Sequence, residues 1–555
     1  MKSPSSRSNT AVLLAVPLLA LGIQANAQQL THVPFANPRI NGVTLPTALS
    51  PELQQIVRAQ GSVPVENPGG GVAFYGYRDD HPNLVPLFTA GVGSNVEASK
   101  TEPDKNTYLV LDDQHGADAN YDYGRRFLYQ GHEGPAALGI GYITRINLDA
   151  DFQHRVTVLA TKEADGVTNL PVFDGSTWYP WSERLLFTWE GNGTTTGGVW
   201  QATPDFPSKA VPLLGVMGRG GFEGIQADSA GNLWIVEDIG GATPAGQTNA
   251  RLPNSFIFRF VPKDRRDLTQ GGKMQVLQVM SKANPGQPIR FQSTSALTQD
   301  IKDLHTYGLV FDTKWITIHD TAVQGFATFN ANQLAKDAGG TPFKRPENGM
   351  FRPGTHFREF YFTETGDTNA TTVAAPDHGG FGGIQKLTQS SPSADTGKLT
   401  LFFRGDLQHT AFDNLAFFDA DRMIAVEDRG ETLHTQGNAL DSGWLLDARV
   451  DYSSGSASPV RIIAQGRDPS ATIDAQLLGT AGFINDGDNE LTGIHVSDGD
   501  PDVNGILGAK IPRPFKDGWR VFYTQQHGDN VTYEIVRQHR AGHRHGDEDD
   551  DDDRW

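Results

Sequence analysis

The sequence predicts an all-β protein, and within that class a β-propeller. Three observations predict it: a strand–turn–strand unit that recurs with acids at both ends, many short runs that alternate apolar and polar residues, and a composition of turn formers. The chain of 555 residues contains 62 glycines and 32 prolines, and 37% of its residues are hydrophobic, which indicates a core with many turns and few long helices. We expect one β domain over residues 72–537, a propeller of about six decorated blades.

The recurring unit is clearest in residues 218–241. Glu223 stands ahead of an apolar strand, a tight turn follows at residues 228–232, and the next strand ends on the acidic pair Glu237-Asp238. Such a unit is half of a propeller blade.

Two further copies of the unit follow. In residues 410–431, Asp413 falls opposite Glu223 and Glu427-Asp428 opposite the second acidic pair. In residues 345–367, a looser copy, Glu347 and Glu364 take these places. Self-similarity of this kind is typical of radial repetition.

The two ends of the chain predict export and accessory segments. Residues 1–27 have a cationic start, an apolar run and a small-residue end, as a cleaved signal peptide does, so we expect a periplasmic or extracellular protein. Residues 28–71 lack strand repetition and are expected to form an N-terminal strap around the domain edge, with a helix-like piece at Pro51–Ala59. Residues 538–555 form a His/Asp-rich tail that we expect to be disordered.

Composition excludes several classes of function. The chain has no cysteine, so disulfides, thiolate ligands and thiol nucleophiles are absent. Its net charge of −19 argues against a nucleic-acid or anionic-membrane partner, and no stretch after the leader favours membrane insertion. Motifs of serine hydrolases, P-loop enzymes and zinc proteases are missing. We expect a monomer that binds a small molecule.

The repeated acids predict a metal centre. The innermost strand of every blade faces the central axis, so acids at one blade position converge, and they cannot all stay ionised without cations or arginines. Calcium accepts many oxygen ligands in loose geometry. Glu223, Glu347 and Glu490 are the first candidates, since each precedes a strand close to a Gly or Pro. The acids at the strand ends, Glu237-Asp238, Glu364 and Glu427-Asp428, are better explained singly as turn caps and blade latches, while Glu133 is open between the two interpretations.

At these residues the chain resembles the PhoX-type secreted alkaline phosphatases, which are calcium- and iron-dependent propeller enzymes. The resemblance covers residues 70 to 530 approximately, and its motifs come in the family's order. They are Gln130–Glu133, Tyr179–Ser182 with Phe187–Glu190, Gly218-Arg219 with Glu223 and Glu237-Asp238, Phe258–Pro262, Arg345–Glu347, Asp413–Leu415, and Asn489-Glu490 with residues 525–528.

The resemblance implies a metal-dependent phosphomonoester hydrolase that acts on a small phosphate ester. It implies calcium held by Glu133, Glu190, Glu223, Glu347, Asp413 and Glu490, and phosphate oxygens gripped by Arg345 and Arg219. The family's thiolate ligand of iron falls at Trp189, which cannot bind iron, so an iron site is either rebuilt from carboxylates or absent.

Two alternatives remain. The replacement at Trp189 favours a calcium-stabilised binding propeller without catalysis. Another propeller hydrolase, of the phytase or lactonase type, is the other alternative, although this acidic chain offers little of the cationic rim that phytate would favour.

Overall fold

The structure is a computed structural model that describes residues 1, 29–39, 45–61, 63–76, 101–134, 141–466, 490–526 and 530–538. The signal peptide expected in residues 1–27 and the tail expected in residues 538–555 lie outside the described residues, apart from Met1 and Gln538.

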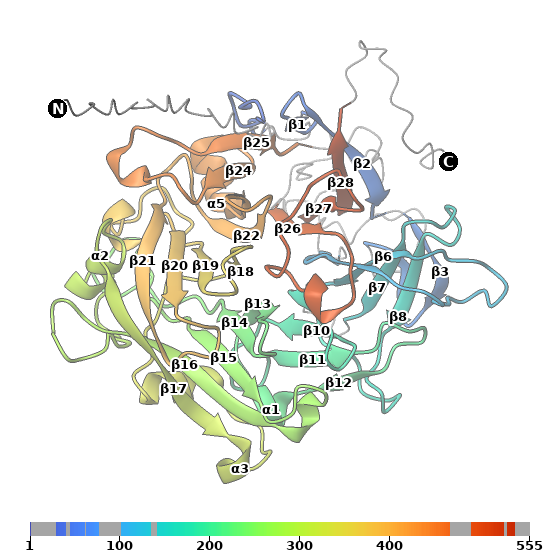
Figure 1. The fold of residues 1–555 in the computed structure, drawn as a ribbon, viewed down its shortest axis with the longest axis horizontal. Helices are drawn as coiled ribbons and strands as arrows, with labels where there is room; N and C mark the ends of the chain where they lie inside the picture. Colours follow the sequence, from blue (N-terminus) through green and yellow to red (C-terminus); the bar gives the residue numbers. More distant parts are fainter. Residues whose placement is uncertain are drawn as a thin grey trace.

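The strands form antiparallel blades around a central axis (Figure 1). The first blade contains β5 (Thr107–Val110), β6 (Arg126–Gly131), β7 (Ile143–Asn147) and β8 (Val156–Ala160). The second contains β9 (Ser176–Tyr179), β10 (Arg184–Trp189), β11 (Gly198–Ala202) and β12 (Ala210–Pro212). The third contains β13 (Phe222–Ala227), β14 (Leu233–Glu237), β15 (Ile257–Pro262), β16 (Gly272–Val279) and β17 (Phe311–Asp320).

The fourth to sixth blades continue the pattern. The fourth contains β18 (Gly349–Phe351), β19 (Glu359–Glu364), β20 (Gly383–Gln389) and β21 (Thr396–Arg404), and its outer strand pairs with β17 of the third blade. The fifth contains β22 (Phe412–Phe417), β23 (Arg422–Glu427), β24 (Ser442–Asp447), β25 (Val460–Ala464) and the short β1 (Ala48–Leu49). The sixth contains β26 (Glu490–Ser497), β27 (Arg520–Gln526), β28 (Val531–Arg537) and β2 (Leu53–Ala59).

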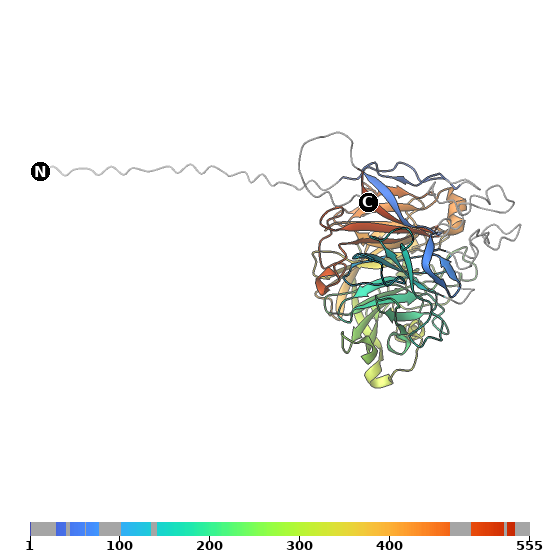
Figure 2. The ribbon, with the colours of Figure 1, turned by 90° about the vertical axis from the view of Figure 1, so that its right-hand side faces the viewer.

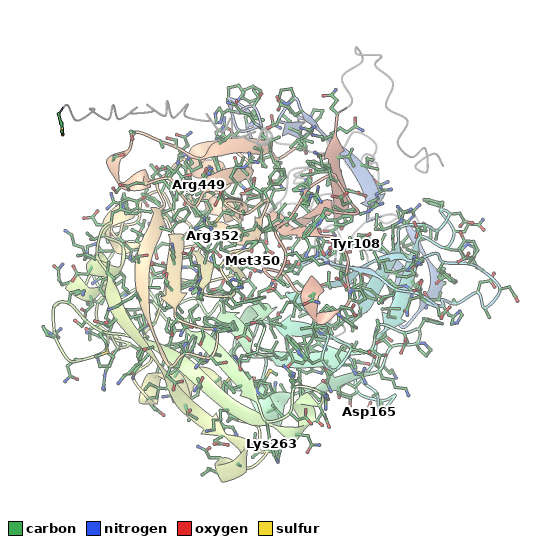
Figure 3. All side chains as sticks on the ribbon, viewed as in Figure 1. Tyr108, Asp165, Lys263, Met350, Arg352 and Arg449 are labelled. Carbon is green, nitrogen blue, oxygen red and sulfur yellow. The ribbon has the colours of Figure 1, made fainter. Side chains whose placement is uncertain are left out.

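The inner strands close a ring. The first strand of each blade lies nearest the axis, and successive inner strands touch in the order β5, β9, β13, β18, β22 and β26, with β26 touching β5 again. Met350, on the inner strand β18, lies near the centre of the molecule, whereas Asp165 and Lys263 lie at the rim (Figure 3). The predicted all-β propeller class is confirmed by this arrangement.

The strap contributes strands to two blades. β2 pairs with β28 from Leu53 opposite Arg537 to Ala59 opposite Thr532, and the side view shows it beside the strands of the sixth blade (Figure 2). The helix-like interpretation of Pro51–Ala59 is therefore wrong. Without β2, the backbone N–H and C=O groups on the outer side of β28 would lack hydrogen-bond partners. Pairing with β28 therefore stabilises the extended conformation of β2 more than its weak local preference stabilises a helix.

Helices and the remaining hairpin are short and peripheral. The hairpin consists of β3 (Pro64–Gly69) and β4 (Val72–Phe74), and β3 lies against β8. The helices are α1 (Leu214–Met217), α2 (Gln299–Leu304), α3 (Thr321–Gln324), α4 (Ala331–Asp337) and α5 (Gly430–Gly437), with 3-10 turns η3 (Leu268–Gln270), η4 (Pro376–His378), η5 (Tyr452–Ser454) and η7 (Val503–Gly505). None of the helices in the described ranges has the length and apolar character needed to span a membrane.

The segment between β26 and β27, residues 498–519, packs against the ends of inner strands. Trp178 of β9 donates a hydrogen bond from its indole nitrogen to the carbonyl of Pro501 over 2.7 Å. Ile506 is buried in the same apolar cluster as Phe351 of β18. This segment therefore joins inner strands from different blades, at the ends opposite to those where the acids lie.

Candidate metal centre

The inner strands β13 and β22 carry the same β-bulge at their starts. Phe222 pairs with Glu237 and Ile225 with Ile235, so β13 contains one residue more than its partner across this interval. In β22 the corresponding interval runs from Phe412 to Leu415. A bulge bends the strand and redirects a side chain, here that of the acid directly after the first paired phenylalanine.

The third copy of the unit has the equivalent register. In each copy, the residue two before the acid accepts a backbone hydrogen bond from the residue that follows the second strand: Gly221 from Asp238, Arg345 from Thr365 and Ala411 from Asp428. The predicted equivalence of Glu223, Glu347 and Asp413 is therefore confirmed. All three acids lie where an inner strand begins, beside the central axis.

The acids at the ends of the second strands mostly hold blades together. Glu237 accepts hydrogen bonds from the backbone N–H groups of Gly221 and Phe256 and from the amide of Asn332. Glu364 and Glu427 accept equivalent bonds from the backbone N–H groups of Lys344 and Thr410. The interpretation of these three glutamates as blade latches is confirmed.

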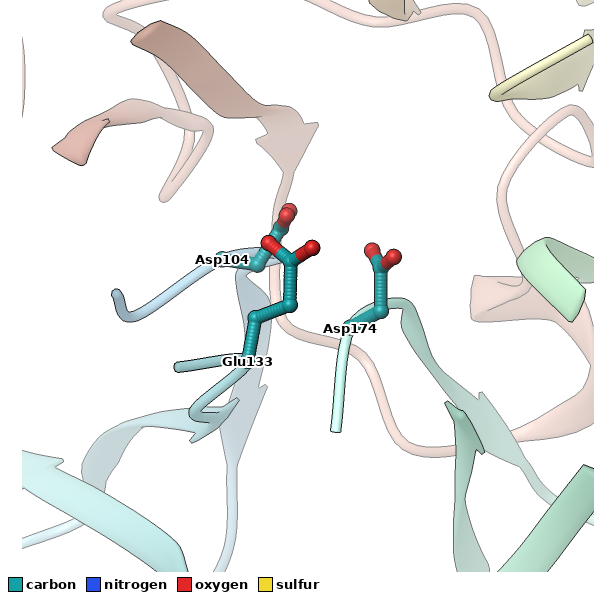
Figure 4. Close-up of side chains that lie close together, drawn as sticks. All are labelled: Asp104, Glu133 and Asp174. Carbon is teal, nitrogen blue, oxygen red and sulfur yellow. The ribbon is translucent and has the colours of Figure 1, made fainter. Parts of the chain in front are cut away.

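Carboxylates from four blades form a continuous arc at the axis. Three overlapping groups have ligand oxygens that all lie within 4.8 Å of one another: Asp104 with Glu133 and Asp174, Asp174 with Glu190 and Glu223, and Glu223 with Asp238 and Glu347. Figure 4 shows the carboxylates of the first group pointing into the same space. We call these seven residues the carboxylate arc: Asp104, Glu133, Asp174, Glu190, Glu223, Asp238 and Glu347.

Two glycines bring neighbouring inner strands close enough to form the arc. A Cβ on Gly175 would overlap the carbonyl oxygen of Glu223, and a Cβ on Gly224 would lie 2.8 Å from the carbonyl oxygen of Glu347. The backbone of each blade thus touches the backbone of the next directly beside the acids. Only glycine permits this approach.

Three members of the arc are not among the residues that the sequence singled out as metal ligands. Asp104 and Asp174 precede β5 and β9, in blades where no repeat of the unit was apparent. The sequence feature that could have identified these two acids is their position, because each lies two or three residues before an inner strand, as Glu347 does. Asp238 was interpreted as part of a latch; it belongs to the third group of the arc and also pairs with Arg345 of the fourth blade.

Burial and mutual repulsion raise the pKa of the acids. Desolvation is the largest cause for Glu133, Asp174, Glu190, Glu223, Glu347 and Glu490, whose pKa values lie well above the ordinary carboxyl value, and neighbouring carboxylates add to it. The same causes raise the pKa of Asp413 to about 8. Such a set becomes fully ionised only when positive charge is supplied.

The donor set fits a cation that prefers oxygen. Glu347 Oε1 and Asp413 Oδ2 are buried oxygens that receive no hydrogen bond from the described part of the chain. Buried acceptors without donors are rare in folded proteins unless an ion or water satisfies them. Carboxylate oxygens alone match the ligand preference of calcium or magnesium. The sequence has no cysteine, and the three groups found among the described residues contain no histidine, which disfavours softer metals.

Arg345 links the arc across two blades. Its Nε and Nη2 donate to Asp238 of the third blade, with an Nη2–Oδ2 distance of 2.7 Å, and Nη2 lies 3.2 Å from Glu347 Oε1. The residue has a φ of 56°, a left-handed conformation that an arginine before a proline adopts only under strain. Strained backbone of this kind is often found at functional sites.

The remaining predicted residues lie differently. Arg219 lines a separate cavity of about 290 Å³ together with Trp189 and Trp200, and donates from Nη1 to the carbonyl of Gly197. No described contact brings it to the carboxylate arc. Trp189 packs its ring edge against Trp200 at 5.8 Å between centroids. Glu490 belongs to none of the three groups, although the charges of Asp428 and Asp413 add to the burial that raises its pKa.

Comparison with known proteins agrees with this architecture. The family model described as alkaline phosphatase PhoX matches residues 247–444. The solved structure of Pseudomonas fluorescens PhoX in complex with vanadate, a transition-state analogue, aligns with a TM-score of 0.52 at 13% sequence identity over 92% of this chain and 98% of that chain. A putative 6-phosphogluconolactonase from Bacteroides fragilis aligns with a TM-score of 0.26 at 10% identity, over 65% of this chain and 81% of that one. No curated protein sequence matches the chain.

Proposed function

We propose that this chain, a PhoX-type protein by its family match at residues 247–444, is a metal-dependent phosphomonoester hydrolase. The observation that carries the proposal is the carboxylate arc with Arg345 beside it. The arc can bind cations, and the guanidinium can bind the oxygens of a phosphate. The vanadate complex of the similar Pseudomonas protein supports phosphoryl chemistry in this fold.

The arc would hold the metal ions. Asp174 and Glu223 each belong to two of the three groups, so each would supply oxygen to more than one group of ligands. Calcium is the cation that we propose, because the donors are all carboxylates in irregular arrangement. Ions bound there would neutralise charge on the phosphate and on the leaving oxygen. Asp413, Glu490 and Glu133 remain as predicted ligands, of which Glu133 is in the arc.

Arg345 would bind and orient the phosphate. Asp238 holds Nε and Nη2, while Nη1 makes no hydrogen bond to the described residues, so its two N–H groups are left for a substrate oxygen. Because the planar guanidinium is fixed on one side by Asp238, the direction of the free N–H groups is set before substrate arrives. A second phosphate contact from Arg219 remains a prediction.

The test is hydrolysis of an aryl phosphate by purified protein. We expect turnover that stops when a chelator removes the metal and returns when calcium is added. Phytate and a lactone serve as competing substrates, and faster turnover of either than of simple monoesters would favour the corresponding alternative. Bound calcium without any hydrolysis would favour the non-catalytic binding propeller.

We also propose that the protein is exported and monomeric. N-terminal sequencing of protein secreted by its host should start at Gln28, after the segment expected to be a signal peptide. Light scattering should give a mass close to that of one chain, whereas a dimer would contradict the second part.

A further inference from the structure

A cavity of about 290 Å³ lies beside the second blade, and its walls are mostly apolar. The rings of Trp189 and Trp200 line it together with the side chains of Leu170, Val172 and Leu214. Trp200 is buried, whereas Trp189 is half-buried. A concave site with apolar walls and a few polar groups is typical of small-molecule binding, and indole rings in such walls favour flat aromatic ligands.

The wall of this cavity continues directly into the carboxylate arc. Trp189 ends β10 and is followed by Glu190, while Val172 lies two residues before Asp174. Both acids belong to the second group of the arc, together with Glu223. Consecutive Cα atoms are about 3.8 Å apart, so the cavity lies at the same end of the propeller as the acids and next to two of them.

Arg219 adds a positive charge to the wall. It lies four residues before Glu223, the third acid of the same group. Its Nη1 donates to the carbonyl of Gly197 over 3.3 Å, and no carboxylate in the described part of the chain pairs with the guanidinium. Glu163, which also lines the cavity, accepts a hydrogen bond from the indole of Trp200 instead. A guanidinium has five N–H donors, so donors remain for an oxygen of a ligand.

We propose that this cavity receives the organic part of an aromatic phosphate monoester whose phosphate lies at the carboxylate arc. Such an ester is a flat apolar ring with oxygens at one end, which matches apolar walls beside N–H donors and a group of metal ligands. An apolar cavity of about 150 Å³ holds a benzene ring, so this one has room for one or two fused rings. The inference rests on the proposed function and names the class of ester that the site selects.

The first test compares 1-naphthyl phosphate with ethyl phosphate, which has no ring. Trp189→Ala removes one ring from the wall of the cavity, and Leu214→Trp fills the cavity. In both variants the ratio of kcat/KM for the naphthyl ester to kcat/KM for the ethyl ester should fall at least tenfold relative to wild type. The ratio cancels any loss of folded enzyme and the intrinsic reactivity of each ester.

The matched control is Trp181→Ala. Trp181 is another half-buried tryptophan of the second blade, in the turn between β9 and β10, and it does not line the cavity. This variant should keep the wild-type ratio. A ratio that stays at the wild-type value in both cavity variants, or that falls as far in Trp181→Ala, would overturn the proposal.

The second test does not need hydrolysis. Calorimetric titration with 1-naphthol, the alcohol that naphthyl phosphate releases, should give one bound molecule per chain, and Trp189→Ala should weaken this binding at least tenfold. Equal affinity in the variant and in wild type, or no binding to wild type, would contradict the proposal. If naphthol binds as expected but neither ester is hydrolysed, the proposed function fails and the assignment of an aromatic ligand to the cavity stands.

Discussion

Neighbouring acids in this chain perform opposite tasks. Glu237 ends β14 and points into its own blade, where three N–H donors satisfy its carboxylate. Asp238, one residue later, joins Glu223 and Glu347 at the axis. Successive side chains of an extended strand point to opposite sides, so a single step along the backbone separates a structural carboxylate from a candidate metal ligand.

At this scale, Arg345 and Glu347 should respond differently to substitution. Glu347→Gln should lower bound metal and activity together, because it removes a charged oxygen from the arc. Arg345→Lys should keep the metal and lower the rate of hydrolysis at least tenfold, which corresponds to about 1.4 kcal/mol in activation free energy. The reason is that the lysine ammonium group cannot reproduce the planar set of N–H donors of a guanidinium group. Metal content and aryl-phosphate kinetics measure both effects.

The competing explanation is that the pair only fastens blades. The structure extends that explanation, since Arg345 contacts Asp238 of the third blade as well as Glu347. In that case both variants should lose stability equally and keep their metal, and such a result would contradict the catalytic role.

A latch carboxylate should affect stability and not metal binding. Glu427 accepts hydrogen bonds from the N–H of Ser442, the indole of Trp444 and Nε of Arg429. Glu427→Gln leaves the buried guanidinium without its partner charge, so we expect a loss of about 3 kcal/mol in the free energy of unfolding, with unchanged calcium content. Urea unfolding measures the loss, and the exposed Asp205→Asn is the control that should change neither quantity.

At the scale of elements, the close approach of β13 and β18 should limit which residues can replace Gly224. Gly224→Ala forces the backbone at Glu347 to move, since the new methyl group would lie 2.8 Å from the carbonyl oxygen of Glu347. We expect a destabilisation of about 1 to 3 kcal/mol together with weaker calcium binding. Calorimetric melting and calcium titration measure the two effects.

Gly69→Ala supplies the matched control, because no atom lies within 4 Å of a Cβ built there. If Gly224→Ala binds calcium as tightly as this control does, the close approach of the strands has no part in shaping the site.

The strand units were predictable because their signal is local. The turn at residues 228–232 follows from Asp228, which accepts hydrogen bonds from the N–H groups of Ala230 and Asn232. The equivalence of Glu223, Glu347 and Asp413 also followed from the repeat. β2 was not predictable in this way, because its partner β28 lies at the other end of the chain.

The site was predictable only in part, because it depends on contacts between blades. Glu133, Glu190, Glu223 and Glu347 were identified as ligands and lie in the arc. Asp104 and Asp174 were missed, since their approach to the axis depends on which inner strands are neighbours, and Asp238 was interpreted only as part of a latch. The resemblance implied a phosphate contact for Arg219, which lines a cavity together with Trp200. That contact stays a prediction.

At the scale of the whole molecule, the metal-free protein should lose stability as pH rises. The folded-state pKa of Asp413 is raised from 3.8 to about 8, and those of Glu223 and Glu347 are also raised. Between the unfolded and folded pKa values the folded state binds more protons, so the free energy of unfolding falls as pH increases through that window. Chelated protein should therefore melt at a lower temperature at pH 8 than at pH 5.

Calcium should remove most of this dependence by compensating the ionised carboxylates. Thermal scans across the pH range, with chelator and with calcium, measure both curves. A chelated protein whose melting temperature rises between pH 5 and pH 8 would contradict the electrostatic description of the site.

The pairing of β2 with β28 determines when the protein can complete its folding. Gln55 and Tyr523, which are hydrogen-bonded across this blade, are 468 residues apart in the chain. Joining segments so distant costs about 5 kcal/mol of loop entropy, and it cannot happen before the last strand has been synthesised. A stalled or clipped chain would carry Asp104, Asp174 and Glu223 without the closed ring that holds them together. Binding of the cation would then distinguish finished molecules from incomplete ones.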